Sequence, residues 1–284
     1  MAREVDGKKI AEEIFSSVRD EVSRIKSMGY KIKLSIVAIG KDNEMELFIR
    51  NKKKYAQFCG IEIEEIYLPQ DITEQDLILK INELNKSDCT GFIIQLPLPP
   101  HIRKEIIDLI SPLKDVDCLT SENLGKVMKD HTTARFIPCA CKSMIDILEI
   151  YGVEVSGKRA VVVGSSDLVG KPCAAVLLNM GATVSVCHKA TDIKNLEELV
   201  RSADIVVSAA GVPGIIKGNW IKPGAVVIDI GTRVVNGKVF GDVEYDLAKE
   251  RASIITPVPG GVGIITVAEL MRNTLKAFFL SKSV

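Results

Sequence analysis

The chain has 284 residues, 46% of them hydrophobic and 26% charged, which suits a globular protein of one large domain or two ordinary ones. Lys plus Arg and Asp plus Glu both number 37, so the zero net charge gives no reason to expect nucleic acid or a membrane surface as a partner. No apolar run reaches membrane-spanning length, and the opening residues MAREVDGKKI lack the apolar core of a signal peptide. We therefore expect a cytoplasmic protein.

The seven cysteines and three histidines are scattered along the chain. Cys139 and Cys141 form only a C-x-C pair, whereas metal sites usually show tighter clusters. We therefore expect no metal, and free thiols as in a reducing cytosol.

In the first half of the chain, short β-branched runs alternate with amphipathic stretches. A first helix is predicted from apolar residues at positions 10, 14, 18, 22 and 25, and Asp6 can cap its start. A helix at 43–59 follows, and another opens at Thr73, where Asp76 resembles part of a capping box. The expected strands cover residues 33–40, 61–68 and 91–95. This order predicts a βαβαβ unit with parallel strands.

The second half carries another set of strands, followed by a last helix from about Thr266 to Ser281. The expected strands cover residues 159–164, 183–188, 204–211, 225–231 and, more briefly, 253–259. We expect two α/β halves with a boundary near 118–138, and a last helix that packs back on the first half.

The stretch RAVVVGSSDLVGKPCAAVLL places a strand directly before a glycine turn and a helix. Gly164 leaves the strand and Gly170 follows six residues on, so backbone N–H groups at a helix N-terminus could bind a pyrophosphate. The spacing is not G-x-G-x-x-G, so a tight turn without a ligand remains the alternative.

The second strand of this half ends in Cys187-His188-Lys189, without an acidic residue. A carboxylate there would favour the free ribose hydroxyl of NAD, whereas a cation could meet a 2′-phosphate, so NADP is favoured over NAD. An exposed Lys189 without a role is the alternative. The next strands end at Gly211 and at Thr232, on the edge where open α/β sheets bind ligands.

The three consecutive lysines of LFIRNKKK differ on a helical wheel. Lys52 falls within the apolar arc of the 43–59 helix, whereas Lys53 and Lys54 point toward solvent. A buried ammonium is costly, and desolvation lowers its pKa toward values useful in proton transfer. The alternative is a stem that covers apolar surface while the charged head reaches water.

Two more stretches hold polar or permissive residues at expected loops. Gln95 ends the third strand before LPLPPHI, and Asp117 follows a helix, so that an acid and an amide could orient a polar heterocycle beside Lys52. The run from Pro257 to Gly263, PVPGGVG, would let backbone approach a flat ligand, or would serve as a domain hinge.

Taken jointly, these motifs resemble the methylenetetrahydrofolate dehydrogenase/methenyltetrahydrofolate cyclohydrolase family over nearly the whole chain. The motifs are GFIIQLPLP (91–99), KDVD (114–117), FIPC (136–139), VVVG with VG six residues on, GNWIKPGAVVIDIG (218–231), GDV-YD-AKERAS (241–253) and TPVPGGVG-IT (256–266).

The resemblance implies an N-terminal α/β catalytic domain of residues 1–120 plus 262–284, and a Rossmann-type NADP-binding domain with a parallel sheet over 121–261. It implies oxidation of 5,10-methylenetetrahydrofolate to the methenyl cation with NADP, hydrolysis to 10-formyltetrahydrofolate in the same cleft, and usually a homodimer. The family's catalytic lysine, pterin-binding glutamine and pterin-anchoring aspartate fall on Lys52, Gln95 and Asp117. Substrate contacts are expected from Phe48, Leu96, Pro97, Leu98, Pro259, Gly260 and Gly261, and cofactor contacts from Gly164, Ser165, Ser166, Val169, Lys189, Gly211 and Thr232.

The chain departs from the family pattern at several of these positions. Phe48 replaces a usual tyrosine four residues before the lysine, so a hydroxyl near the amine is absent and we expect an impaired cyclohydrolase step. Ile264 replaces the proline of GGVGP, and PCTP becomes PCAC at 138–141. Ser165 replaces the arginine of the cofactor turn, and Lys189 replaces a common serine. One cation near the ribose phosphate is thus lost and another is gained, so the use of NAD in place of NADP stays open.

Three alternatives remain at this point. The chain could be a dehydrogenase only, or another two-domain NADP dehydrogenase of the shikimate type, which gives no role to QLPLP or PGGVG. It could also be a folate or nucleotide sensor without catalysis, since four motif positions are altered.

Overall fold

The computed structural model describes residues 2–41, 43–235 and 238–282. The chain forms two compact units. The N-terminal unit comprises residues 11–125, 135–139 and 267–284, and the C-terminal unit residues 1–10, 126–134 and 140–266. The functional domains expected to divide at residues 120 and 262 stay a prediction. The compact units divide at residues 125 and 266, and the first ten residues belong to the C-terminal unit. None of the helices in the described part of the chain could span a membrane.

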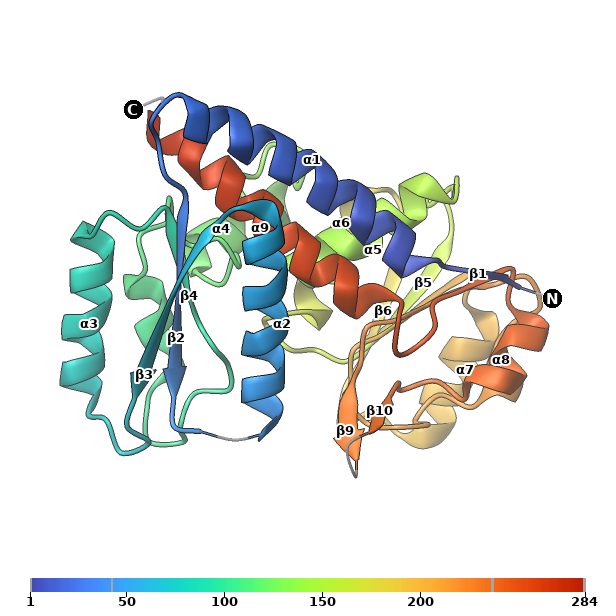
Figure 1. Ribbon diagram of the computed structural model, residues 1–284. Coiled ribbons are helices and arrows are strands. Elements are labelled where there is room, and N and C mark those ends of the chain that lie inside the picture. Colours follow the sequence, from blue (N-terminus) through green and yellow to red (C-terminus); the bar gives the residue numbers. More distant parts are fainter. Residues whose placement is uncertain (1, 42, 236–237, 283–284) are drawn as a thin grey trace. The chain divides into compact units, whose positions relative to one another are not determined.

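The N-terminal unit is built on the expected βαβαβ segment. Its strands are β2 (Lys33–Ile39), β3 (Glu62–Leu68) and β4 (Gly91–Ile94), in the order β3-β2-β4 and all parallel. The connection from β2 to β3 and that from β3 to β4 run in opposite directions across the sheet, and their helices α2 (Asn43–Cys59) and α3 (Glu74–Lys86) cover opposite faces (Figure 1).

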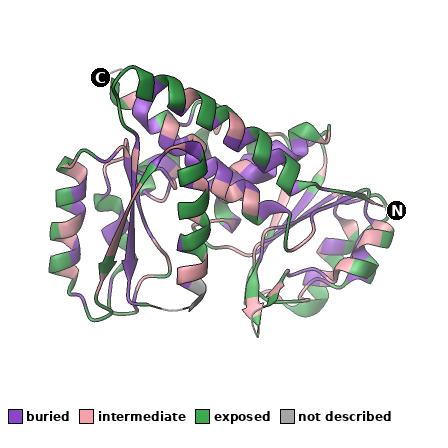
Figure 2. Cartoon of the chain, viewed as in Figure 1, coloured by how far each residue is buried: buried purple, intermediate pink, exposed green. Residues whose placement is uncertain are grey.

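Burial follows the sheet order. Central strand β2 is buried along nearly its whole length, whereas edge strand β3 is half-buried (Figure 2). The face toward α3 packs Val37, Phe92 and Ile94 against Leu77 and Ile81, all at most 1% exposed. The N-cap of α3 is as expected: Thr73 Oγ1 accepts the Asp76 N–H at 3.1 Å, and its hydroxyl donates to the Asp76 carboxylate.

The first and the last helices were expected from the sequence, whereas the shorter helical segments between residues 104 and 150 were not given bounds. Helix α1 (Gly7–Ser27) is capped by Asp6, which accepts the Lys9 N–H at 3.0 Å, as expected. Helix α9 (Val262–Lys282) begins four residues earlier than expected, and from Val267 on it belongs to the N-terminal unit, as the predicted packing of the last helix required. Helices α4 (Ser121–Lys129) and α5 (Cys139–Ile150) and the 3-10 helix η1 (Lys104–Leu109) complete this set.

The C-terminal unit holds a six-stranded parallel sheet in the order β1-β11-β8-β7-β5-β6. Its strands are β1 (Arg3–Glu4), β5 (Arg159–Val163), β6 (Thr183–Cys187), β7 (Ile205–Ser208), β8 (Val226–Asp229) and β11 (Ile254–Ile255). Its other elements are α6 (Gly170–Asn179), α7 (Ile193–Ser202), α8 (Tyr245–Arg251), the 3-10 helix η2 (Gly218–Trp220) and the antiparallel pair β9 (Arg233–Val235) and β10 (Lys238–Phe240).

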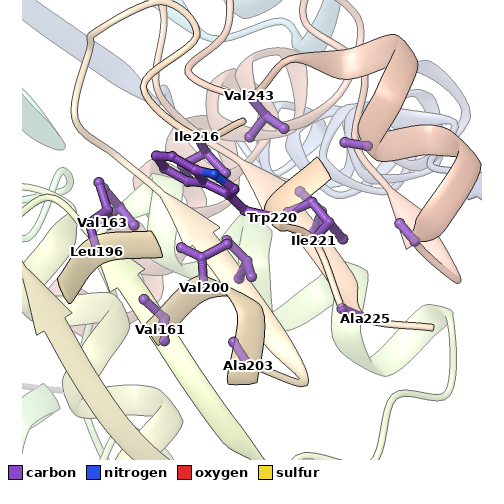
Figure 3. Packing of buried hydrophobic residues seen from close by; sticks show 14 of the residues in the cluster. Val161, Val163, Leu196, Val200, Ala203, Ile216, Trp220, Ile221, Ala225 and Val243 are labelled. Atoms are coloured by element: carbon purple, nitrogen blue, oxygen red, sulfur yellow. The ribbon is translucent and has the colours of Figure 1, made fainter. Parts of the chain in front are cut away.

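One face of this sheet packs around Trp220. Val161 of β5 and Leu196 and Val200 of α7 lie in the same buried cluster as the indole, which is 8% exposed (Figure 3). Strand β5 lies between β6 and β7, and the chain passes from β6 across β5 to β7. In open α/β sheets, ligands bind outside the carboxyl ends of the strands at such a reversal of strand order, which here means β5 and β7.

Candidate active site

Helix α2 positions Lys52 on its buried side. Met45, Ile49 and Ala56 on this helix are buried, and half-buried Lys52 donates from Nζ to Gln95 Oε1 at 2.6 Å. Lys53 instead pairs with Glu65, where its side chain is 46% exposed, and Lys54 lies 5.1 Å over the Tyr55 ring. The three lysines therefore differ as the helical wheel predicted.

Gln95 follows β4 directly and is fixed by two contacts. Its Oε1 accepts from Lys52, and its Nε2 donates to the Leu96 carbonyl at 3.2 Å. Leu96 and Leu98 are half-buried beside the hydrophobic cluster of this unit, and Pro97 between them is exposed. Phe48, one turn before Lys52, is 38% exposed and so lies at the margin of the buried face of α2.

Asp117 completes a group of polar side chains in the N-terminal unit. Burial raises the pKa of its carboxyl, and the positive charge of Lys52 acts against that rise. Burial lowers the pKa of Lys52, and the negative charge of Asp117 acts against that fall. A desolvated amine, a carboxyl and an amide are thus brought together, which suits proton transfer and recognition of a polar heterocycle.

Two residues of this group were missed from the sequence. The Cys139 thiol forms a hydrogen bond with Asp117, and burial raises its pKa well above the usual value. Asn273 of α9 donates from Nδ2 to the Val116 and Ile137 carbonyls at 2.9 and 3.1 Å, so it fixes the backbone on either side of the Asp117–Cys139 contact. The FIPC motif could have indicated Cys139; no local signal marks Asn273.

Neighbouring Asp115 has a structural part instead. Its buried carboxylate accepts the N–H groups of Leu119 and Thr120, the Thr120 hydroxyl and the Asn123 amide at 2.7–2.9 Å. These bonds hold the turn that leads from Asp117 into α4.

In the C-terminal unit, the glycine turn joins β5 to α6. Gly164 has φ +123°, and a Cβ there would lie 2.3 Å from the Ala209 carbonyl oxygen; a Cβ at Gly170 would lie 2.1 Å from the Gly164 carbonyl oxygen. Only glycine allows this close approach of strand, turn and helix. The Ser166 hydroxyl accepts the N–H groups of Val169 and Gly170 at 3.2 and 3.4 Å, and Ser165 beside it is half-buried.

The other expected cofactor residues lie at the carboxyl ends of neighbouring strands. Lys189 is exposed just after β6, in a turn closed by the Thr191 hydroxyl, which accepts the His188 N–H at 2.9 Å. Gly211 has φ +66° after β7, and Thr232 is exposed after β8. The PVPGGVG loop belongs to the same unit, with Pro259 and Gly260 exposed and Gly261 buried. Gly260 has φ +102°, and a Cβ there would have no atom within 4 Å, so the loop leaves room for a flat ligand at this residue.

Among the described residues, no cluster of three or more His, Cys, Asp or Glu could hold a metal ion. All seven cysteines are buried, and none of them forms a disulfide. The expected site residues therefore divide between the units. Lys52, Gln95 and Asp117 lie on the N-terminal unit, whereas the expected cofactor residues lie on the C-terminal unit together with the expected substrate contacts Pro259, Gly260 and Gly261.

Comparison with known families decides the identity of the fold. The model of the tetrahydrofolate dehydrogenase/cyclohydrolase catalytic domain matches residues 5–117, and that of the NAD(P)-binding domain of the same family matches residues 138–282. The chain belongs to the tetrahydrofolate dehydrogenase/cyclohydrolase family. The resemblance inferred from the sequence is confirmed, and with it the two-domain α/β fold, the enzyme class and the nicotinamide cofactor.

Relatives of this family match over almost the whole chain. The bifunctional protein FolD of Halothermothrix orenii is 44% identical over 279 residues, 98% of each chain. The Trypanosoma brucei methylenetetrahydrofolate dehydrogenase-cyclohydrolase, solved with NADP and an inhibitor, is 40% identical with a TM-score of 0.95, covering 100% of this chain and 99% of that one.

A shikimate 5-dehydrogenase from Thermus thermophilus is 14% identical with a TM-score of 0.55, covering 89% of this chain and 94% of that one. That likeness extends to the fold alone, so the shikimate alternative is not favoured.

Proposed function

We propose that this chain oxidises 5,10-methylenetetrahydrofolate to the 5,10-methenyl cation with NADP and then hydrolyses the cation to 10-formyltetrahydrofolate. The observation that carries the proposal is the 2.6 Å hydrogen bond between Lys52 Nζ and Gln95 Oε1, near the half-buried Asp117. Lys53, the next residue of α2, instead pairs with the Glu65 carboxylate at the exposed side of the helix, as an ordinary surface lysine does.

Asp117 and Gln95 would recognise the pterin ring. A buried carboxyl and an amide of fixed orientation offer the acceptor and donor pattern that a polar heterocycle needs, and the Lys52 bond holds the Gln95 oxygen in one direction. Phe48 would contribute its ring face to the aromatic part of the substrate.

Lys52 would act in the hydrolytic step. Because burial lowers its pKa, a larger fraction of the amine is neutral near pH 7 than for an exposed lysine, and a neutral amine can take the proton of the attacking water. Hydride transfer needs mainly orientation of the two reactants, so it depends less on this amine.

NADP, when bound, accepts the hydride. The residues of the C-terminal unit fit such a group: the close-packed Gly164 and Gly170 leave no side chain between the turn and a pyrophosphate at the start of α6. Lys189, exposed at the end of β6 with no acidic residue beside it in sequence, would favour a 2′-phosphate. The chain would therefore prefer NADP, with NAD as a poorer acceptor.

The homodimer and the cytoplasmic location expected from the sequence are part of the same proposal, as are tetrahydrofolate derivatives as substrates. The functional division into residues 1–120 plus 262–284 and residues 121–261 is retained as well.

The reaction itself is tested by mixing the chain with 5,10-methylenetetrahydrofolate and NADP and following NADPH formation. Formation of NADPH, faster than with equal NAD, supports the proposal. If neither NADPH forms from NADP nor NADH from NAD, the dehydrogenase proposal fails and the sensor alternative is favoured.

Replacing Phe48 by tyrosine is expected to raise the rate of cation hydrolysis about tenfold, the effect of one added hydrogen bond to a charged group. Residues 48 and 52 are one turn apart on α2, so the new hydroxyl would lie on the side of the amine. The decay of the methenyl cation measures it. Phe58→Tyr, also on α2 but 48% exposed and more than one helical turn after Lys52, is the control and should leave the rate unchanged.

A further inference from the structure

The turn after β7 is held by one buried carboxylate. Asp242 is fully buried, and its Oδ2 accepts the Ser208 hydroxyl at 2.7 Å and the N–H groups of Ala210 and Gly211 at 2.7 and 3.2 Å. Its Oδ1 accepts the Val212 N–H at 2.7 Å. Four donors thus converge on one side chain from a segment 30 residues earlier in the chain, a set that only an ionised carboxylate satisfies fully.

Two glycines make room for this arrangement. A Cβ at Gly231 would lie 1.9 Å from Asp242 Oδ2, and a Cβ at Gly241 would lie 2.2 Å from Asp229 Oδ2. The Asp242 carboxylate therefore occupies the space that a side chain at position 231 would take, and the Asp229 carboxylate the space that a side chain at position 241 would take. The space is built for the pair, since any larger residue at either glycine would displace one of the two acids.

Asp229, the last residue of β8, is the second acid. Its Oδ2 accepts the Val243 N–H at 3.0 Å, and its Oδ1 has no hydrogen-bond partner among the described residues. Burial raises the pKa of this carboxyl to about 7, and the negative charge of Asp242 contributes to the rise. Among the described residues, the other groups that act on this carboxyl are neutral backbone N–H groups, those of Gly231, Asp242 and Val243. The Thr256 hydroxyl accepts the N–H of Asp229 itself.

The held turn lies at the edge expected to take the cofactor. Ser208 pairs with Val163 in the sheet, and the Ala209 carbonyl oxygen lies against Gly164. A shift of the Ala210–Val212 turn would therefore move the wall against which the Gly164 turn packs. Gly211, an expected cofactor residue, belongs to this turn, and its N–H is directed to Asp242.

We propose that Asp242 is a positioning residue for the nicotinamide cofactor, and that Asp229 holds the proton that keeps the buried pair at a single negative charge. The inference rests on the proposed cofactor site. The Asp242 carboxylate fixes the shape of the Ala210–Val212 turn without touching the ligand. Ionisation of Asp229 would place a second charge beside the first without a counter-ion, and would loosen the turn.

The direct test is binding of NADPH, followed by its fluorescence, to the full chain and to Asp242→Asn. An asparagine has one acceptor oxygen, so its NH₂ group would face either Val212 N–H or the three donors at Oδ2. We expect the dissociation constant for NADPH to rise about tenfold or more, with the KM for the folate substrate unchanged. Asp246→Asn, which removes an exposed acid of α8 in the same unit, should bind as the unaltered chain does.

A merely structural role for Asp242 would lower the folded fraction and leave the dissociation constant of the folded protein unchanged, and that result would overturn the inference. If the unaltered chain does not bind NADPH, the proposed function fails and the inference with it. If the unaltered chain binds NADPH and Asp242→Asn binds it equally well, the inference fails and the proposed function is unaffected.

The second measurement does not depend on how well Asp242→Asn folds. In the unaltered chain, NADPH binding is expected to weaken about threefold to tenfold between about pH 6 and about pH 8.5, as Asp229 ionises. In Asp229→Asn this part of the weakening should be lost. The 2′-phosphate of the ligand also titrates, but equally in both proteins, so the difference between them belongs to Asp229. Identical pH profiles for the two proteins would overturn the role given to Asp229.

Discussion

Replacing Lys52 by methionine is expected to slow hydrolysis of the methenyl cation by about 10²- to 10⁴-fold, the usual contribution of a positioned acid or base. Methionine keeps the length of the side chain but removes the amine that donates to Gln95. Hydride transfer, which depends mainly on the orientation of the reactants, should fall much less. Decay of the cation and formation of NADPH, measured on the same preparation, separate the two effects.

Lys53→Met is the matched control for this substitution. It removes the same charge from the next residue of α2, where the lysine pairs only with Glu65 at an exposed position. Such surface pairs contribute little, so both activities should stay within about twofold of the unaltered chain. Equal loss of hydrolysis in the two variants would contradict the role given to Lys52.

The second large effect is expected at Asp117. Asp117→Asn should raise the KM for the folate substrate by about 10- to 100-fold, because a charged hydrogen-bond partner is replaced by a neutral one in a buried place. Steady-state kinetics at saturating NADP measure this change. Asp88→Asn, on an acid whose side chain is 86% exposed in the same unit, is the control and should leave the KM unchanged.

The same variant also has a signature in the pH dependence of hydrolysis. The negative charge of Asp117 raises the pKa of Lys52 against the lowering caused by burial. The neutral amine that acts as base is present above that pKa, so hydrolysis rises as the pH passes through it. Loss of the Asp117 charge lowers the pKa further, and the rising limb should therefore move to lower pH. A limb that stays in place, or moves to higher pH, would show that the two groups are not coupled.

Elements with a clear period were predictable from the sequence. The strands of the βαβαβ unit, the 43–59 helix and the Thr73 cap follow from alternating or helical spacing of apolar residues and from local capping chemistry. Strand β1, of two residues, was not predictable, because it is defined by its pairing with β11 about 250 residues later and carries no period of its own. The expected strand 204–211 ends at Ser208, since Asp242 takes the N–H groups of the next turn.

The site divides in the same way. Lys52 was predictable because a lysine inside an apolar arc violates the pattern of its own helix, and Gln95 because it ends a buried strand. Asn273 forms hydrogen bonds with a segment more than 100 residues earlier in the chain, and Asp242 with a segment about 30 residues earlier. Contacts at such separations leave no local pattern in the sequence that could have predicted them. Helix α9 starts at Val262, before Ile264 where the family usually has proline, and the local pattern alone did not place that start.

The most direct test of the account is a titration of Lys52 itself. In protein carrying ¹³C at the lysine ε-carbon, the resonance that disappears in Lys52→Met identifies the residue. It should titrate at a lower pH than the other lysines, because the amine is turned into the protein rather than into water, and it should shift on addition of a tetrahydrofolate substrate. A resonance that titrates with the surface lysines near pH ~10.4 and is unmoved by the folate would contradict the account.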